Sequence, residues 1–270
     1  MNKMENAITA SHVRQMLNKV PEITIFFWII KVLSTTVGET GADLIDETFN
    51  IGLDGLTLIF GTVLIVTLVF QFKSKKYTPG IYWLTVVLIS IVGTLITDDL
   101  TDNYEVPLEI TTAVFTILLA VTFAVWYKKE KTLSIHAVNT TKREAYYWIA
   151  ILFTFSLGTA AGDLLSESME FGYLVPLAIF SMLIASVAIA RFGFKIHTVA
   201  AFWIAYVLTR PLGASIGDYL SQDLESGGLE LGAEITSIIF LATILALVVY
   251  LSVTKKDVIE NNEISDIPMN

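Results

Sequence analysis

Long apolar runs separated by short polar segments dominate this chain. Each run is close to the roughly 20 residues that a membrane-spanning helix requires. The runs show no period-two alternation and are about twice as long as a barrel strand, so they predict helices. Eight helices are expected, at residues 23–44, 53–72, 81–96, 106–127, 146–165, 172–192, 199–220 and 231–251. The pattern therefore predicts an all-α integral membrane protein.

Composition strengthens this prediction, since 54% of the residues are hydrophobic, 16% are charged and the mean hydropathy is +0.67. A soluble domain has a lower apolar share and a higher charged share. The chain has no cysteine, which excludes disulfides, thiolate metal ligands and catalytic thiols. The first 20 residues lack an apolar core and a cleavage site, so we expect a short cytoplasmic tail there.

Basic residues predict the orientation of the helices. Only Lys31 and Arg210 lie well inside expected helices; the other 15 of the 17 basic residues, with Arg191 at the very end of an expected helix, lie in or next to the tails and every second loop. Basic loops stay on the cytoplasmic side of a membrane. We therefore expect both termini in the cytoplasm.

A repeated frame is the most informative feature of the sequence. It starts with an aromatic pair whose second member is Trp28, Trp83, Trp148 or Trp203. Counting from that tryptophan, position ten is always glycine: Gly38, Gly93, Gly158 and Gly213. Position fifteen is always aspartate: Asp43, Asp98, Asp163 and Asp218. Each repeat holds two helices and returns to its starting side, so we expect four parallel repeats in two pseudo-symmetric halves.

The repeats divide the chain into five parts. These are a cytoplasmic tail (1–21), a first half (22–127), a cytoplasmic linker (128–144), a second half (145–253) and an acidic cytoplasmic tail (254–270). The four Trp-x9-Gly-x4-Asp frames resemble an uncharacterised bacterial family of multi-pass proteins built from four tandem two-helix repeats. The resemblance covers Phe26 to Leu251. It implies a bacterial inner-membrane location and this architecture, but no reaction.

Glycine and tryptophan have structural explanations within the frame. The glycine at position ten and a small residue at position fourteen lie on one helix face, a spacing that lets helix backbones approach closely in lipid. The tryptophans stand at the predicted cytoplasmic ends, where we expect them to anchor the helices at the membrane interface.

The four aspartates lack such an explanation. Each lies about 22 Å beyond its tryptophan, at the expected C-terminal end of a helix, where an anion opposes the helix dipole. Position eleven lies on nearly the same face and carries Glu39, Thr94, Thr159 or Ala214. Carboxylates and hydroxyls in this arrangement suit a hard cation. The alternative is that the aspartates mark the water boundary or bond across the glycine seam.

The two cations inside the helices break the repeat symmetry. Lys31 is three residues beyond Trp28, and we expect it to extend to the cytoplasmic surface. Arg210 lies about 10 Å in and precedes Pro211, so we expect it to pair with a carboxylate, Glu39 or Asp43. Such a pair is either a gate or a fixed brace.

These features favour a transporter or channel for a small hard cation such as Mn²⁺, Mg²⁺, Na⁺ or H⁺. The candidate binding or gating residues are Glu39, Asp43, Thr94, Asp98, Thr159, Asp163, Asp218 and Arg210. The alternative is a noncatalytic scaffold, a sensor or a small-solute carrier. The Gly-x-Gly-Asp motif of intramembrane aspartyl proteases is incomplete, so we expect no enzyme and no cofactor. Expected partners are the cation and the lipid bilayer, with no nucleic acid, and the pattern leaves oligomerisation open.

Overall fold

The computed structural model describes residues 18–49, 51–169 and 171–258. Eight long helices agree with the eight expected spans to within a few residues. They are α2 (Ile25–Phe49), α3 (Leu53–Lys73), α4 (Pro79–Asp98), α5 (Leu108–Glu130), α6 (Thr141–Asp163), α7 (Leu174–Phe192), α8 (Thr198–Ser221) and α9 (Ala233–Thr254). α6 begins five residues earlier than the apolar run because the Thr140 side chain accepts a hydrogen bond from the Arg143 amide and caps the helix.

Seven of the helices in the described residues are long and apolar enough to cross a membrane, and α2 is not among them. α2 contains Lys31, Glu39, Asp43 and Asp46, which lower its hydropathy. The architecture is that of a multi-pass membrane protein whose first long helix depends on its neighbours to shield charged groups.

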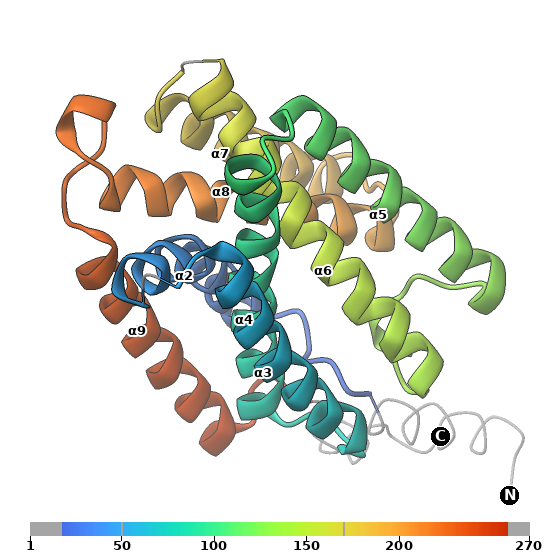
Figure 1. Cartoon of the computed structure of the whole chain (residues 1–270). Helices are drawn as coiled ribbons and strands as arrows, with labels where there is room; N and C mark the ends of the chain where they lie inside the picture. Colours follow the sequence, from blue (N-terminus) through green and yellow to red (C-terminus); the bar gives the residue numbers. More distant parts are fainter. Residues whose placement is uncertain (1–17, 50, 170, 259–270) are drawn as a thin grey trace, which may run out of the picture.

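The first helices of the four repeats form a closed ring (Figure 1). α2 packs on α4, α4 on α6, α6 on α8, and α8 returns to α2. The buried share of the spans is 78% in α4 and 56% in α6 and α8, but only 11% to 22% in α3, α5, α7 and α9. The ring helices therefore form the core, and the other four helices cover them.

Each covering helix packs mainly on the ring helix of the following repeat. α3 lies on α4, α5 on α6 and α7 on α8, while α9 closes the circle on α2. The repeats are thus linked to one another as well as joined through the chain.

The glycines at position ten make the ring tight. A side chain added at Gly38, Gly93 or Gly158 would collide with Ser90, Phe155 or Arg210, and one at Gly213 would collide with Thr35. All four collision partners occupy position seven of the next repeat around the ring. The expected structural role of these glycines is therefore confirmed, and the same contact recurs four times.

Aromatic side chains fill one end of the ring, which we call the aromatic end. Trp83, Trp148 and Trp203 are at most 5% exposed and pack against neighbouring rings. The expectation that the tryptophans lie at the lipid interface as anchors is wrong for these three, because they face the inside of the bundle. The hydroxyls of Tyr82 and Tyr147 lie 2.5 Å apart in the same layer.

The segment from Asn18 to Thr24 lies against the aromatic end. The Lys19 amide donates to the Val138 carbonyl, and the Glu22 amide donates to the Asp257 carbonyl. The Lys19 ammonium pairs with buried Glu144 at 2.6 Å. Part of the predicted tail is therefore packed into the protein, while residues 1–17 and 259–270 lie outside the described residues.

Candidate functional site

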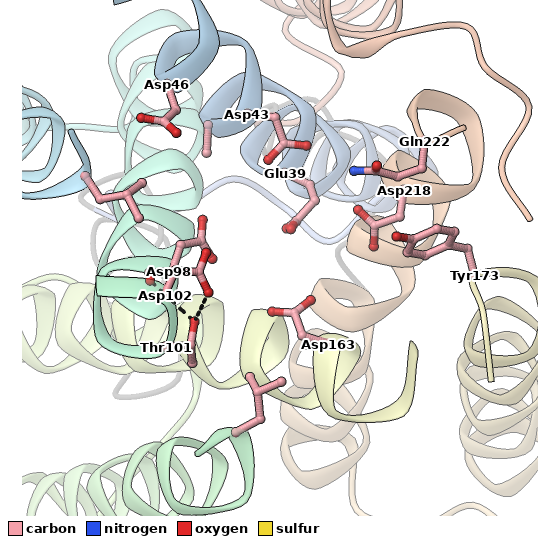
Figure 2. A pocket seen from close by; sticks show the side chains of 13 residues that line it. Glu39, Asp43, Asp46, Asp98, Thr101, Asp102, Asp163, Tyr173, Asp218 and Gln222 are labelled. Carbon is pink, nitrogen blue, oxygen red and sulfur yellow. Dashed lines mark hydrogen bonds between the residues drawn. The ribbon is translucent and has the colours of Figure 1, made fainter. Parts of the chain in front are cut away.

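The four aspartates of position fifteen and Glu39 line one pocket at the opposite end of the ring, which we call the acidic pocket (Figure 2). Its volume is about 180 Å³. The pocket is lined by Glu39, Ala42, Asp43, Asp46, Leu53, Asp98, Thr101, Asp102, Leu108, Asp163, Tyr173, Asp218 and Gln222. No Lys, Arg or His is among the described residues that line it. The structure thus brings together side chains from all four repeats.

The ends of the ring helices position these carboxylates differently. Asp98 and Asp163 are the last residues of α4 and α6, and each is followed by a wider helical turn, at Asp99–Asn103 and Leu164–Ser168. Asp43 lies within α2, which continues to Phe49, so this aspartate is not terminal. The aspartates therefore reach the same end of the ring, although they lie at different distances from the C-terminal ends of their helices.

Three carboxylates come together at the centre of the pocket. Oxygen atoms of Glu39, Asp163 and Asp218 all lie within 4.8 Å of one another, and Figure 2 shows these side chains pointing toward a shared space. Asp218 is only 7% exposed, so its carboxylate is largely removed from water. Like charges at this spacing repel unless a proton or a cation lies between them. The three carboxylates are therefore close enough together for one hard cation to contact all of them.

Arg210 lies eight residues, about two helical turns, before Asp218 in α8, and its guanidinium reaches the level of position eleven. Its side chain is fully buried, and Nη2 lies 2.8 Å from a Glu39 carboxylate oxygen, so the expected ion pair is present. Nη1 donates to the Thr35 carbonyl at 3.3 Å. Nη2 also donates to the hydroxyls of Thr94 and Thr159. The guanidinium is thus held by position eleven of three repeats.

This arrangement corrects the expected role of two hydroxyls. Thr94 and Thr159 are fully buried and do not line the acidic pocket. Their oxygens accept hydrogen bonds from Arg210, so they hold the guanidinium and not an ion in the pocket. Position eleven of the fourth repeat is Ala214, which offers no oxygen.

Lys31 also departs from expectation. The side chain does not extend to the surface; it is 0% exposed. Nζ lies 4.1 Å from the centroid of the Phe155 ring and 4.4 Å from that of Tyr206. Position three of the frame faces the inside of the ring in all four repeats, and this sets the direction of the Lys31 side chain. Lys31 therefore cannot turn outward unless α2 moves.

Other pocket residues were missed by the sequence reasoning, although a signal for them existed. Asp46 is three residues after Asp43, and Asp102 is four residues after Asp98. Gln222 stands four residues after Asp218. Side chains three or four positions apart share a helix face, so the spacing predicts that these residues face the same side as the aspartates.

A family model described as Repeat of Unknown Function (DUF347) matches the chain four times. The matched residues are 26–77, 81–132, 146–196 and 201–257, which agree with the four tryptophan frames. Neither the curated proteins nor the solved structures gave a match to the chain. The four matches cover most of the chain, which therefore belongs to this family of repeats of unknown function.

Proposed function

We propose that this protein is a membrane transporter for a small hard cation and that the acidic pocket is the place where the cation first binds. The triad of Glu39, Asp163 and Asp218 carries the proposal, because three carboxylates within 4.8 Å offer a divalent ion several oxygen ligands at once. The chain offers no thiolate, so Mn²⁺ and Mg²⁺ fit this site better than soft ions do.

The orientation belongs to the same proposal. The aromatic starts of the four ring helices meet at one end and their aspartates at the other, which supports parallel repeats. The N-terminal segment, the linker and the residues after α9 contact one another at the aromatic end. Together with the basic loops, this supports cytoplasmic termini and a pocket that opens to the outside of a bacterial inner membrane.

A gated transporter fits the ring better than an open channel does. Beneath the pocket, the axis is occupied by Arg210, then by the fully buried layer of Lys31, Val86, Ile151 and Tyr206. A cation that takes the carboxylate of Glu39 competes with the Arg210 guanidinium for it. Opening of the ion pair by the cation is therefore the proposed first step of passage.

Equilibrium binding to the purified full-length protein in detergent tests the proposal, with Mn²⁺, Mg²⁺, Ca²⁺ and Na⁺ measured separately. We expect saturable binding of a divalent ion and roughly tenfold or greater weakening by Asp218→Asn, because one charged ligand is lost. Glu234→Gln is the matched control: it removes one carboxylate from the first turn of α9, where the side chain is exposed and outside the pocket.

Uptake of the bound ion into proteoliposomes then tests transport itself. Binding without uptake would favour a sensor. Failure of all four ions to bind would overturn the cation proposal and leave a scaffold or a small-solute carrier as the better explanation.

A further inference from the structure

Lys31 is a buried cation that the proposed function does not use. Its side chain is 0% exposed, and Nζ has no hydrogen-bond partner among the described residues. In the described part of the chain, the groups in direct contact with its charge are two ring faces, those of Phe155 and Tyr206. The interaction with a ring face compensates for only a small part of the hydration free energy that an ammonium loses when it is buried. A lysine kept in this position without a carboxylate needs an explanation beyond packing.

The layer of Lys31 is completed by apolar or aromatic side chains in the other repeats. The positions that correspond to Lys31 are Val86, Ile151 and Tyr206. All three are fully buried, so none of them opens a route for water to the ammonium. A hydrophobic residue would fill the same space in the first repeat without the penalty of a buried charge.

The neighbouring charged groups are arranged unfavourably for a permanent charge on Lys31. Arg210 stands one helical turn further along the axis, and its guanidinium also lies over the Phe155 ring, 5.7 Å from the centroid. The one carboxylate in ion-pair contact with Arg210 in the described part of the chain is Glu39. The charge of Glu39 therefore offsets two cations as long as the pocket is empty.

The other titratable groups around this layer are few. The packed helices carry Tyr206 and Arg210 on α8, Tyr147 on α6, Tyr82 on α4, and Glu234 and Tyr250 near the two ends of α9. None of these is a carboxylate at the height of Lys31, because Glu234 is in the first turn of α9, away from the aromatic end where Tyr250 packs on Phe26.

We propose that Lys31 is a proton-binding site that couples the cation in the acidic pocket to a proton moving the opposite way. The inference rests on the proposed function. When a cation takes Glu39, Arg210 loses the carboxylate that offsets its charge, and two positive groups remain close together in a dry core. Release of a proton from Lys31 removes one of them. Cation binding and protonation of Lys31 thus exclude each other.

The proton step is a simple ionisation. One N–H bond of the ammonium breaks, the electron pair stays on Nζ as the amine, and the proton leaves to water in the acidic pocket, at the end where the cation binds. From the layer of Lys31 to the aromatic end the ring carries the buried hydroxyls of Tyr206, Tyr147 and Tyr82, the last two 2.5 Å apart. The amine takes a proton back from the aromatic end after the cation has left Glu39 toward that end, so one proton moves outward for each cation that moves inward.

Calorimetric titration of Mn²⁺ into the purified full-length protein, in buffers of different ionisation enthalpy, measures the protons released on binding. We expect Lys31→Met to release about one proton fewer per Mn²⁺ than the wild-type protein, because release is linked to binding at the shared carboxylate. The release that remains in the variant belongs to the carboxylates of the pocket. Lys75→Met, at an exposed lysine of the loop after α3, is the control and should match the wild type.

Proteoliposomes loaded with a pH dye provide the second measurement. Mn²⁺ uptake by the wild type should move protons the other way, whereas Lys31→Met and Lys31→Gln should exchange Mn²⁺ for Mn²⁺ without proton movement. Equal proton release by the wild type and Lys31→Met would overturn this inference and leave the proposed function standing. If neither variant folds, wild-type Mn²⁺ uptake without proton movement would overturn it. Absence of Mn²⁺ binding to the wild type would overturn the proposed function and this inference with it.

Discussion

The two ends of the ring are built by the same four helices and the same repeated frame, yet one is hollow and the other is filled. At the acidic pocket, carboxylates from all four repeats surround a space of about 180 Å³. At the aromatic end, Phe27, Tyr82, Tyr147 and Trp203 are at most 5% exposed and pack ring against ring. A close-packed end specifies the fold, whereas an end that gathers like charges does not stabilise it. The difference indicates that the aromatic end maintains the ring and that the acidic end is kept open for a ligand.

Arg210 lies between the aromatic end and the acidic pocket. Its replacement should have the largest effect on the stability of the protein. Arg210→Ala leaves the carboxylate of Glu39 without its partner in a buried site, so we expect the free energy of unfolding to fall by about 3–5 kcal/mol. Denaturant unfolding in detergent and the yield in the membrane fraction measure this. Arg191→Ala, in the last turn of α7, is the control and should change little.

Combining Arg210→Ala with Glu39→Gln sharpens the test. The double variant removes both charges, so we expect folding to recover while cation uptake does not. Normal uptake by the double variant would show that the pair is only a brace. A single variant as stable as the wild type would contradict the expected ion pair.

The close approach of the ring helices should have the next largest effect. A methyl group at Gly158 would overlap Cβ and Cγ of Arg210 and lie 3.0 Å from Cδ of Pro211, so α6 and α8 must separate. Overpacking of this kind costs about 1–3 kcal/mol. We expect Gly158→Ala to lower thermal stability in detergent, whereas Gly61→Ala, with no atom within 4 Å of the added carbon, should not. Equal effects of the two changes would mean that the seam is not a close contact.

At the aromatic end a smaller effect is expected from Tyr82→Phe. The change removes one partner of the 2.5 Å contact with the Tyr147 hydroxyl, at a cost of about 1 kcal/mol. Adding Tyr147→Phe should recover part of the loss, since the buried Tyr147 hydroxyl is then no longer left without Tyr82 as its partner. Tyr104→Phe, at a position 61% exposed, serves as the control in the same unfolding assay. A loss of cation binding in Tyr82→Phe would contradict the division between the two ends.

The smallest expected effect is a pH dependence of local stability at a contact that lies outside the membrane-spanning helices. His136 Nδ1 lies 3.4 Å from a Glu22 carboxylate oxygen, and the hydrogen bond to Glu22 raises the pKa of His136 above its ordinary value of 6.5. The group gains protons on folding, so its stabilisation is fully present below pH 6.5 and is lost as the pH rises through the raised pKa. We expect hydrogen exchange near Glu22 to be faster at high pH in the wild type. Glu22→Gln should abolish this difference beyond the intrinsic pH effect, and a difference that persists would exclude His136 as its source.

The number of helices and their order could be predicted from the sequence, because each apolar run is long enough to cross a bilayer and polar loops separate the runs. The pairing of Arg210 with Glu39 was also predictable, since a buried guanidinium needs a carboxylate and few were at the right height. Both predictions depend on distances along a helix, which the chain fixes directly.

The packing of covering helices and the position of Lys31 could not be predicted in this way. That α3 lies on α4, and not on its own partner α2, depends on contacts between repeats that no spacing in one repeat specifies. Lys31 was expected at the surface because lysines near helix ends usually reach water. The inward direction of position three becomes visible only when the four helices are placed in a ring, so this error and the burial of the tryptophans have the same origin.

The contact between α9 and α2 has a consequence for biosynthesis. A ribosome makes the chain from its N-terminus, so the most charged of the long helices, α2, emerges first. The helix that covers it, α9, ends at Thr254 and is the last of the eight long helices to be made. Until α9 is made, α2 lacks its covering helix, and until α8 is made, Glu39 also lacks its partner Arg210. We expect other proteins of the membrane to shield α2 until α9 arrives, so nascent chains arrested before α9 should remain bound to them.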